Sequence, residues 1–151
     1  KGLILGGSHA SNYNLKNSLV GDLSAILIEN CPAIVNYMRV PKKEIALLSD
    51  FEEKMDKIAR ATMNANVTNL SGVPSWMMAV LKHLLEITGK TTLEEVWPNL
   101  EVFFHGGVAF TPYREQYKQL IRKPDMKYME TYNASEGFFG IQNDPADPLC
   151  C

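Results

Sequence analysis

The sequence has few cysteines, no long apolar run and no excess of charge of either sign. Its 151 residues include three cysteines, Cys31, Cys150 and Cys151, too few for the disulfide framework of a small secreted domain. A reducing, cytoplasmic setting is therefore predicted. Apolar runs such as residues 25–28 fall far short of the roughly 20 residues that span a membrane. Fifteen Lys and Arg against seventeen Asp and Glu leave a net charge of −2, so we expect neither nucleic acid nor a membrane as a partner.

The composition is that of a folded domain, because hydrophobic residues make up 46% of the chain and charged residues 21%. The length corresponds to about one domain. Lys1 opens directly into an apolar segment, and the last residues, 144–151, read as an interrupted loop. We therefore expect this sequence to be a piece of a longer protein.

Short apolar segments alternate with amphipathic ones along the chain. Strands are predicted at residues 3–5, 67–70, 99–105 and 126–132, and helices at 19–29, from 51, 74–88 and 111–121. Residues 34–40 fit either a strand or a short helix. The alternation predicts an α/β fold with a partly parallel sheet flanked by helices.

The clearest predicted helix begins after Ser49, which forms a capping box with Glu52. An apolar stripe follows at helical spacing, formed by Phe51, Met55, Ile58, Ala59 and Thr62. A second helix is expected to begin at Pro74 and to end at Gly89.

Two polar or glycine-rich turns follow predicted strands. Gly106 and Gly107 come after the strand at 99–105, and residues 132–137 come after the strand that begins near Met126. One helix separates these strands, so they form a βαβ unit whose turns share the carboxyl edge of the sheet, where ligands bind in α/β folds. Taken alone, the glycines are more often a tight turn, and Ser135-Glu136 fits a helix start.

Taken together, the two turns carry groups suited to a nucleotide. Glycines allow a planar base to approach the backbone, and Tyr132 offers a ring face for stacking. The Ser135 hydroxyl can donate to a phosphate oxygen, and the Glu136 carboxylate can bind magnesium. Neither the glycine-rich lysine loop of P-loop proteins nor the dinucleotide fingerprint is found in the sequence.

Three segments, residues 67–74, 100–108 and 128–137, resemble the central core of the adenylate-forming enzymes. These are the acyl-CoA synthetases, luciferases and peptide-synthetase adenylation domains. Residues 132–141 are closer to one branch, because they resemble the Tyr-x-x-Ser-Glu-x-x-Phe-Gly-Ile motif of the auxin-responsive acyl-acid amido synthetases. Residues 6–9 and 21–26 resemble the bacterial members. The resemblance extends to about Asn143.

This resemblance implies an enzyme that activates a carboxylic acid with ATP and magnesium. The carboxylate attacks the α-phosphorus, pyrophosphate leaves, and the amine of an amino acid then attacks the acyl carbon of the acyl-adenylate to give an amide. The implied fold is the central part of the N-terminal adenylate-forming domain, over residues 1–151.

The resemblance also implies roles for individual residues. The nucleotide site would comprise Gly106, Gly107 and Val108 along the adenine, Tyr132 on the base, Asn133 and Ala134 beside it, Ser135 at the α-phosphate and Glu136 on Mg²⁺. Ser135 and Glu136 would be the catalytic residues. The acyl pocket would be lined by Ser71, Gly72, Val73 and Trp76.

The family's phosphate-binding Ser/Thr/Gly loop and its C-terminal lid domain, with the catalytic lysine, are not found in these 151 residues. We therefore expect the isolated piece not to turn over ATP. Asn133 and Ala134 also replace the Gly-x of the wider superfamily. Two alternatives remain: a ligase with the same first step and a thiol acceptor such as coenzyme A, or a non-catalytic α/β interaction domain. His9 and His105 fit structural roles better than ligand contacts, and the oligomeric state is left open.

Overall fold

A computed structural model describes residues 1–8, 21–134, 136–144 and 146, and its centre is a six-stranded sheet in the order β2-β1-β3-β4-β5-β6. Neighbouring strands from β2 to β5 are parallel, and β6 is antiparallel to β5. The strands are β1 Gly2–Ile4, β2 Arg39–Val40, β3 Asn69–Gly72, β4 Val102–His105, β5 Lys127–Ala134 and β6 Gly137–Ile141. The predicted α/β fold with a partly parallel sheet is confirmed.

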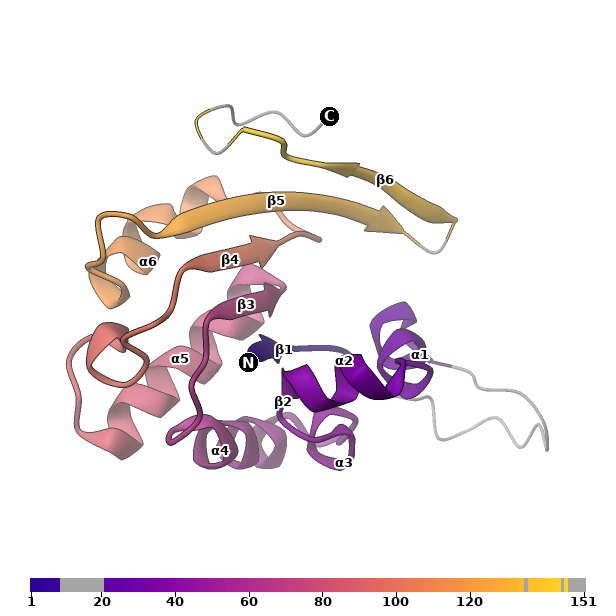
Figure 1. The fold of residues 1–151 in the computed structure, drawn as a ribbon, viewed down its shortest axis with the longest axis horizontal. Coiled ribbons are helices and arrows are strands. Elements are labelled where there is room, and N and C mark those ends of the chain that lie inside the picture. Colours follow the sequence, from indigo (N-terminus) through magenta and orange to yellow (C-terminus); the bar gives the residue numbers. More distant parts are fainter. Residues whose placement is uncertain (9–20, 135, 145, 147–151) are drawn as a thin grey trace.

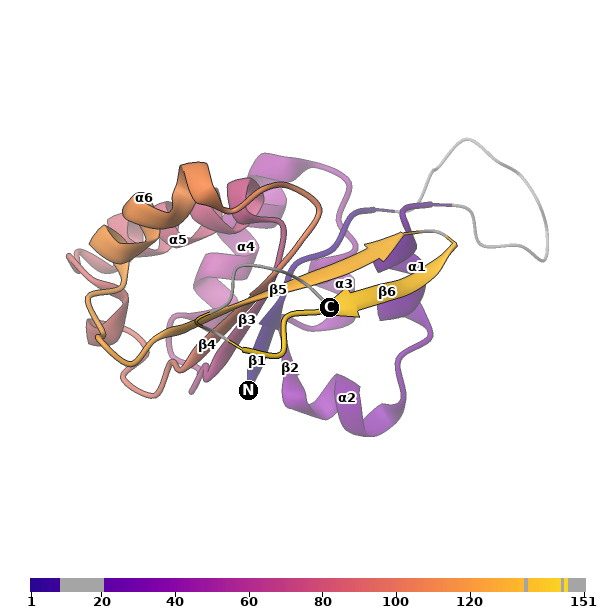
Figure 2. The same ribbon diagram turned by 90° about the horizontal axis from the view of Figure 1, so that it is seen from above.

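Helices connect the parallel strands (Figure 1). They are α1 Leu23–Glu29, α2 Ala33–Met38, α3 Lys43–Ala46, α4 Phe51–Thr62, α5 Pro74–Thr88 and α6 Arg114–Leu120, with single 3₁₀ turns η1 Leu93–Glu95 and η2 Thr111–Tyr113. Figure 2 shows α4, α5 and α6 on one face of the sheet, whereas α2 lies on the other side.

The hydrophobic core lies between the sheet and the helices α4, α5 and α6. In β4, Phe103 is fully buried while its neighbour Val102 is half-buried, because successive side chains of a strand point to opposite faces. Leu70 of β3 and Leu81 of α5 are likewise fully buried. The apolar residues of the central strands therefore fix which face carries the helices.

Helix α5 begins and ends as its sequence predicts. Pro74 occupies its first turn, and Gly89 ends it with a φ of 67°. This left-handed conformation favours glycine, because other residues place a Cβ against the backbone there.

The structure corrects one local prediction and decides between the two alternatives left open for another. Asp50, rather than Ser49, caps α4, because its carboxylate accepts a hydrogen bond from the Glu53 backbone N–H at 2.7 Å. The predicted capping box with Glu52 is therefore wrong by one residue. The segment 34–40 is mainly helix α2, and only Arg39–Val40 pairs with β1.

None of the helices in the described ranges is both long and apolar enough to cross a membrane.

Candidate functional site

Strands β3 and β4 end side by side at one edge of the sheet, next to Glu130 of β5. Gly72 ends β3 opposite His105, the last residue of β4, and His105 lies opposite Glu130 of β5. Figure 1 shows the arrowheads of the three strands on the same side. The Gly106-Gly107 turn and the continuation of β5 therefore share this edge.

Gly106 lies directly against β5. A Cβ on Gly106 would come within 2.3 Å of the Thr131 carbonyl oxygen, and the Thr131 hydroxyl donates to the His105 carbonyl at 3.2 Å. This close approach of two backbones requires glycine whether or not a ligand binds. Tyr132, the next residue of β5, is 58% exposed beside this contact.

Gly107, which follows the end of β4, lies close to the segment that follows β3. Its φ is 83°, and a Cβ built on it would lie 3.3 Å from the Val73 side chain. Val73 is the N-cap residue of α5. Two of the predicted site regions, the nucleotide turn and the start of the acyl-pocket helix, are thus in contact, and Val108 beyond them is exposed.

Beyond Glu130, β5 continues for four residues that pair with β6. At about 3.3 Å per residue, this places Ala134 roughly 13 Å past the end of β4. The Tyr132 ring packs on Phe139, with centroids 5.4 Å apart, and Asn133 is exposed. The second predicted turn therefore belongs to the hairpin of β5 and β6, which extends beyond the end of β4.

Glu136 is exposed in the turn between β5 and β6, so the alternative of a helix start at this point is wrong. Ser135 lies outside the described residues, as does His9. Over the ranges that the structure describes, no group of three or more His, Cys, Asp or Glu is placed to hold a metal ion. Magnesium in nucleotide sites is held by one or two carboxylates plus phosphate oxygens, and one exposed Glu136 fits that pattern.

A cavity of about 200 Å³ lies at the same edge of the sheet, between the end of β1 and helices α4 and α5. Trp76 lines it with Phe51, and their ring centroids are 6.4 Å apart. Of the four residues predicted for the acyl pocket, only Trp76 lines this cavity, because Ser71, Gly72 and Val73 stay at the strand end. Leu5 connects the two regions, since it lines the cavity and lies 3.0 Å from the position of a Cβ on Gly72.

Lys54 brings a charge into this largely apolar cavity, whose lining also includes Ser8 and Ser49. Its side chain is buried, and its ammonium donates to the carbonyls of Gly6 and Gly7 at 2.6 and 3.1 Å. Burial lowers the pKa of Lys54, and the nearby Asp22 carboxylate partly offsets that effect. Lys54 is not among the residues predicted from the sequence, although it lies three residues after Phe51 and four before Ile58, within the apolar stripe of α4.

The His105 ring lies below the edge rather than in the site. It stacks on Phe110 at a centroid distance of 4.1 Å, and burial lowers its pKa to about 4, helped by Arg114. The imidazole is therefore neutral near pH 7, in line with a structural role. In the described part of the chain, its buried Nδ1 has no hydrogen-bond partner.

Comparison with known families adds a further finding. Residues 8–126 match the family model described as the GH3 family N-terminal domain. No curated protein matches the chain.

Proposed function

Because the chain belongs to the GH3 family of auxin-responsive acyl-acid amido synthetases, within the adenylate-forming superfamily, we propose that it is part of an ATP-dependent acyl-acid amido synthetase. A carboxylate oxygen attacks the α-phosphorus of ATP, and the bond from this phosphorus to the pyrophosphate breaks. The amine nitrogen of an amino acid then attacks the acyl carbon, loses a proton and releases AMP.

The proposal assigns residues 1–151 to the central part of the N-terminal adenylate-forming domain of a longer cytoplasmic enzyme. The resemblance of residues 6–9 and 21–26 to bacterial members supports a place in that branch. Residues 8–126 lie within the family's N-terminal domain, which supports this position in the longer protein.

One observation carries the nucleotide site: Gly106 packs against the Thr131 backbone, so the paired glycines lie beside the segment of β5 that leads into Tyr132, Asn133 and Ala134. Gly106, Gly107 and Val108 then border the adenine, and Tyr132, Asn133 and Ala134 form its other wall. Glu136 holds Mg²⁺, which neutralises charge on the phosphate oxygens. Ser135, which precedes Glu136 in the sequence, is assigned to the α-phosphate.

The acid is assigned to the neighbouring region. Val73 touches Gly107, and Trp76, three residues later on α5, lines the apolar cavity. Ser71 and Gly72 lie at the strand end between these two points. An acid seated here has its carboxylate near the nucleotide and its apolar part between α4 and α5.

Protection of the protein against thermal unfolding by ATP and Mg²⁺ tests the nucleotide site. Ligand that binds the folded state raises the unfolding temperature, so the protein containing these residues is heated with and without ATP and MgCl₂. We expect Glu136→Gln to lose the magnesium-dependent part of the increase. Glu101→Gln, an exposed carboxylate just before β4 at the opposite edge, should keep it. Equal protection of both variants would contradict the assignment.

The identity of the acyl acceptor, either an amino acid or coenzyme A, is tested separately by product analysis. The protein is supplied with a panel of carboxylic acids, ATP, Mg²⁺ and either amino acids or coenzyme A, and pyrophosphate release identifies the acid that is activated. An amide product supports the proposal, whereas a thioester supports an acyl-CoA ligase.

A further inference from the structure

Five cationic side chains line one pocket at the amino edge of the sheet, opposite the edge that carries the proposed nucleotide site. They are Arg114 and Lys118 of α6, Arg122 and Lys123 of the loop that follows, and Lys127 at the start of β5. We propose that this pocket binds a small molecule that carries two phosphate groups. The site is additional to the proposed function and does not rest on it.

The pocket concentrates positive charge in a chain that is slightly acidic as a whole. Its five cations are a third of the fifteen Lys and Arg residues, whereas the net charge of the chain is −2. Among the described residues, no acidic side chain lines the pocket, although Asp125 lies in the same loop. A concave surface lined by charge of one sign raises the local concentration of ions of the other sign, so an anion is the expected ligand.

Most of this charge is not neutralised within the described part of the protein. Of the five cations, only Lys118 has an ion-pair partner there, the Glu115 carboxylate at 2.9 Å. The Lys123 ammonium donates to a backbone carbonyl at 2.9 Å, which positions the group but does not cancel its charge. Arg122 and Lys127 are exposed, and neither has a hydrogen-bond or ion-pair partner in the described ranges. Four cations, Arg114 included, are therefore available to one ligand.

Arg114 is positioned by an aromatic ring. Its guanidinium lies over the Phe110 ring, 5.4 Å from the ring centroid, and this cation–π contact restricts the side chain without removing its charge. A planar guanidinium can donate two parallel hydrogen bonds to one phosphate group. Arg122 offers a second guanidinium, so the pocket can bind more than one phosphate.

The amount of charge and the size of the pocket favour a small phosphorylated molecule. A phosphate monoester carries a charge of about −1.5 to −2 at pH 7, so two such groups balance four cations, whereas a carboxylic acid needs four carboxylates. The pocket has a volume of about 430 Å³, and small-molecule sites typically have roughly 300–1,000 Å³. Ile121, Met126 and Tyr128 supply apolar surface for the body of the ligand.

The confinement of the charge to the pocket disfavours a nucleic-acid strand. A strand binds along a positively charged groove that follows its backbone over several nucleotides. Here the exposed carboxylates of Glu115 and Asp125 adjoin the cationic residues in the sequence, and they would repel the rest of a long polyanion. A compact ligand avoids this repulsion.

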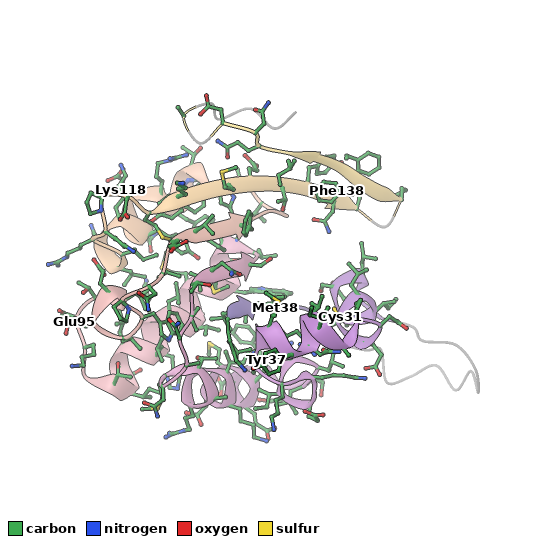
Figure 3. All side chains as sticks on the ribbon, viewed as in Figure 1. Cys31, Tyr37, Met38, Glu95, Lys118 and Phe138 are labelled. Carbon is green, nitrogen blue, oxygen red and sulfur yellow. The ribbon has the colours of Figure 1, made fainter. Side chains whose placement is uncertain are left out.

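Strand β5 separates the pocket from the glycine turn. Lys127 begins β5, and Thr131, whose backbone contacts Gly106, comes four residues later. At about 3.3 Å per residue, this distance is roughly 13 Å along the strand. Figure 3 shows Lys118 at the end of the molecule away from Phe138 of the β5–β6 hairpin. Substitutions in the pocket therefore test it separately from the nucleotide site.

Calorimetry in the presence of EDTA tests the proposal on the protein that contains these residues. The probes are inorganic pyrophosphate, fructose 1,6-bisphosphate and inorganic phosphate, with a short oligothymidylate as the probe for a strand. The pocket variant is Arg122→Gln/Lys127→Gln. Its matched control, Lys42→Gln/Lys90→Gln, removes the same charge outside the pocket. All four positions are exposed, so neither variant disturbs the core.

We expect the wild type to bind pyrophosphate or fructose 1,6-bisphosphate roughly tenfold more tightly than inorganic phosphate, because the second phosphate engages further cations. The preferred probe shows whether the two phosphates are adjacent or separated. The pocket variant should bind that probe roughly tenfold more weakly for each charge removed, as for hydrogen bonds to a charged group. The control should stay within about twofold of the wild type, since its charges lie outside the pocket.

No binding of either two-phosphate probe, or affinity no higher than for inorganic phosphate, would overturn the proposal. Equal weakening in the control would do the same, because it would indicate a response to net charge alone. Tighter binding of the oligothymidylate than of both probes, lost in the pocket variant, would identify a nucleic-acid surface instead. The pocket variant should also keep its magnesium-dependent ATP protection, and joint loss of this protection and of probe binding would refute a separate site.

Discussion

Gly106 and Thr131 touch through their backbones: a Cβ on Gly106 would lie 2.3 Å from the Thr131 carbonyl oxygen. The contact links the turn after β4 to Thr131, the first residue of β5 beyond its pairing with β4. It thereby fixes where the next residue, Tyr132, lies relative to that turn. Its role is structural, and it supports the proposed nucleotide site by holding the glycine turn against the outer part of β5.

Gly106→Ala should therefore destabilise the fold. The added methyl group meets a backbone atom that cannot move aside, and overpacking of this kind costs about 1–3 kcal/mol. Urea denaturation measures the change. Gly89→Asn is a suitable control, because Gly89 has open space around its Cβ position and Asn tolerates the left-handed conformation. An unchanged unfolding midpoint in Gly106→Ala would contradict the backbone contact.

Folding stability should fall on acidification because of His105. Its pKa is lowered to about 4 in the folded state from an ordinary value of 6.5, so between these values the unfolded chain binds more protons than the folded one. The stabilisation is complete above about pH 6.5 and is lost as the pH falls toward 4, by about 3 kcal/mol in total.

The check is the difference between the wild type and His105→Phe in unfolding free energy across this pH range. The variant keeps an aromatic ring against Phe110 but has no proton to gain, so its curve should be flatter. His83→Asn provides the control, since His83 is partly exposed beside Asp56. Parallel curves for the wild type and His105→Phe would show that His105 does not stay neutral.

Tyr117 and Tyr128, whose hydroxyl groups are both buried, should respond in opposite ways to loss of the hydroxyl group. The Tyr117 hydroxyl donates to the Pro74 carbonyl at 2.7 Å, and Tyr117→Phe removes this buried hydrogen bond at a cost of about 1 kcal/mol. The buried Tyr128 hydroxyl has no partner within the described ranges, so Tyr128→Phe should be neutral or stabilising. Denaturation of both variants under one set of conditions provides the comparison, and equal losses would contradict it.

The outer hairpin should promote self-association of the chain. Phe138, labelled in Figure 3, is 65% exposed on β6, and Phe139 and Ile141 on the same strand are also exposed. An apolar strand at a sheet edge favours pairing with another copy. We expect Phe138→Lys to shift the sedimentation distribution toward monomer, whereas Thr111→Lys, at an exposed polar site, should not. A wild-type chain that is monomeric at high concentration would refute this prediction.

The sequence predicts the alternation of strands and helices well, because burial periodicity and helix stop signals are local. Pro74 and Gly89 bound α5 for this reason. Residues 34–40 are harder, because a run of β-branched and aromatic residues fits both periodicities. Only pairing with β1 limits the strand to Arg39–Val40.

The candidate site likewise has a part that the sequence predicts and a part that it does not. The common edge of the glycine turn and β5 follows from the βαβ connection, so it is predictable. The hairpin at Glu136 is less predictable from the sequence, because its turn depends on pairing between β5 and β6 rather than on local signals. The buried position of the Lys54 ammonium is not predictable either, because its acceptors, the carbonyls of Gly6 and Gly7, come nearly fifty residues earlier in the sequence.

The four-residue extension of β5 beyond β4 has a mechanical consequence. Glu136 sits at the tip of a two-stranded ribbon, with a register shift between Tyr132 and Asn133 at its base, whereas the glycines are fixed in the body of the sheet. A small change of twist at that bulge swings the carboxylate through a larger arc, as a lever amplifies rotation at its pivot. The separation between the Glu136 carboxylate, proposed to bind the metal, and the glycine turn, proposed to border the base, is thus adjustable without any rearrangement of the core.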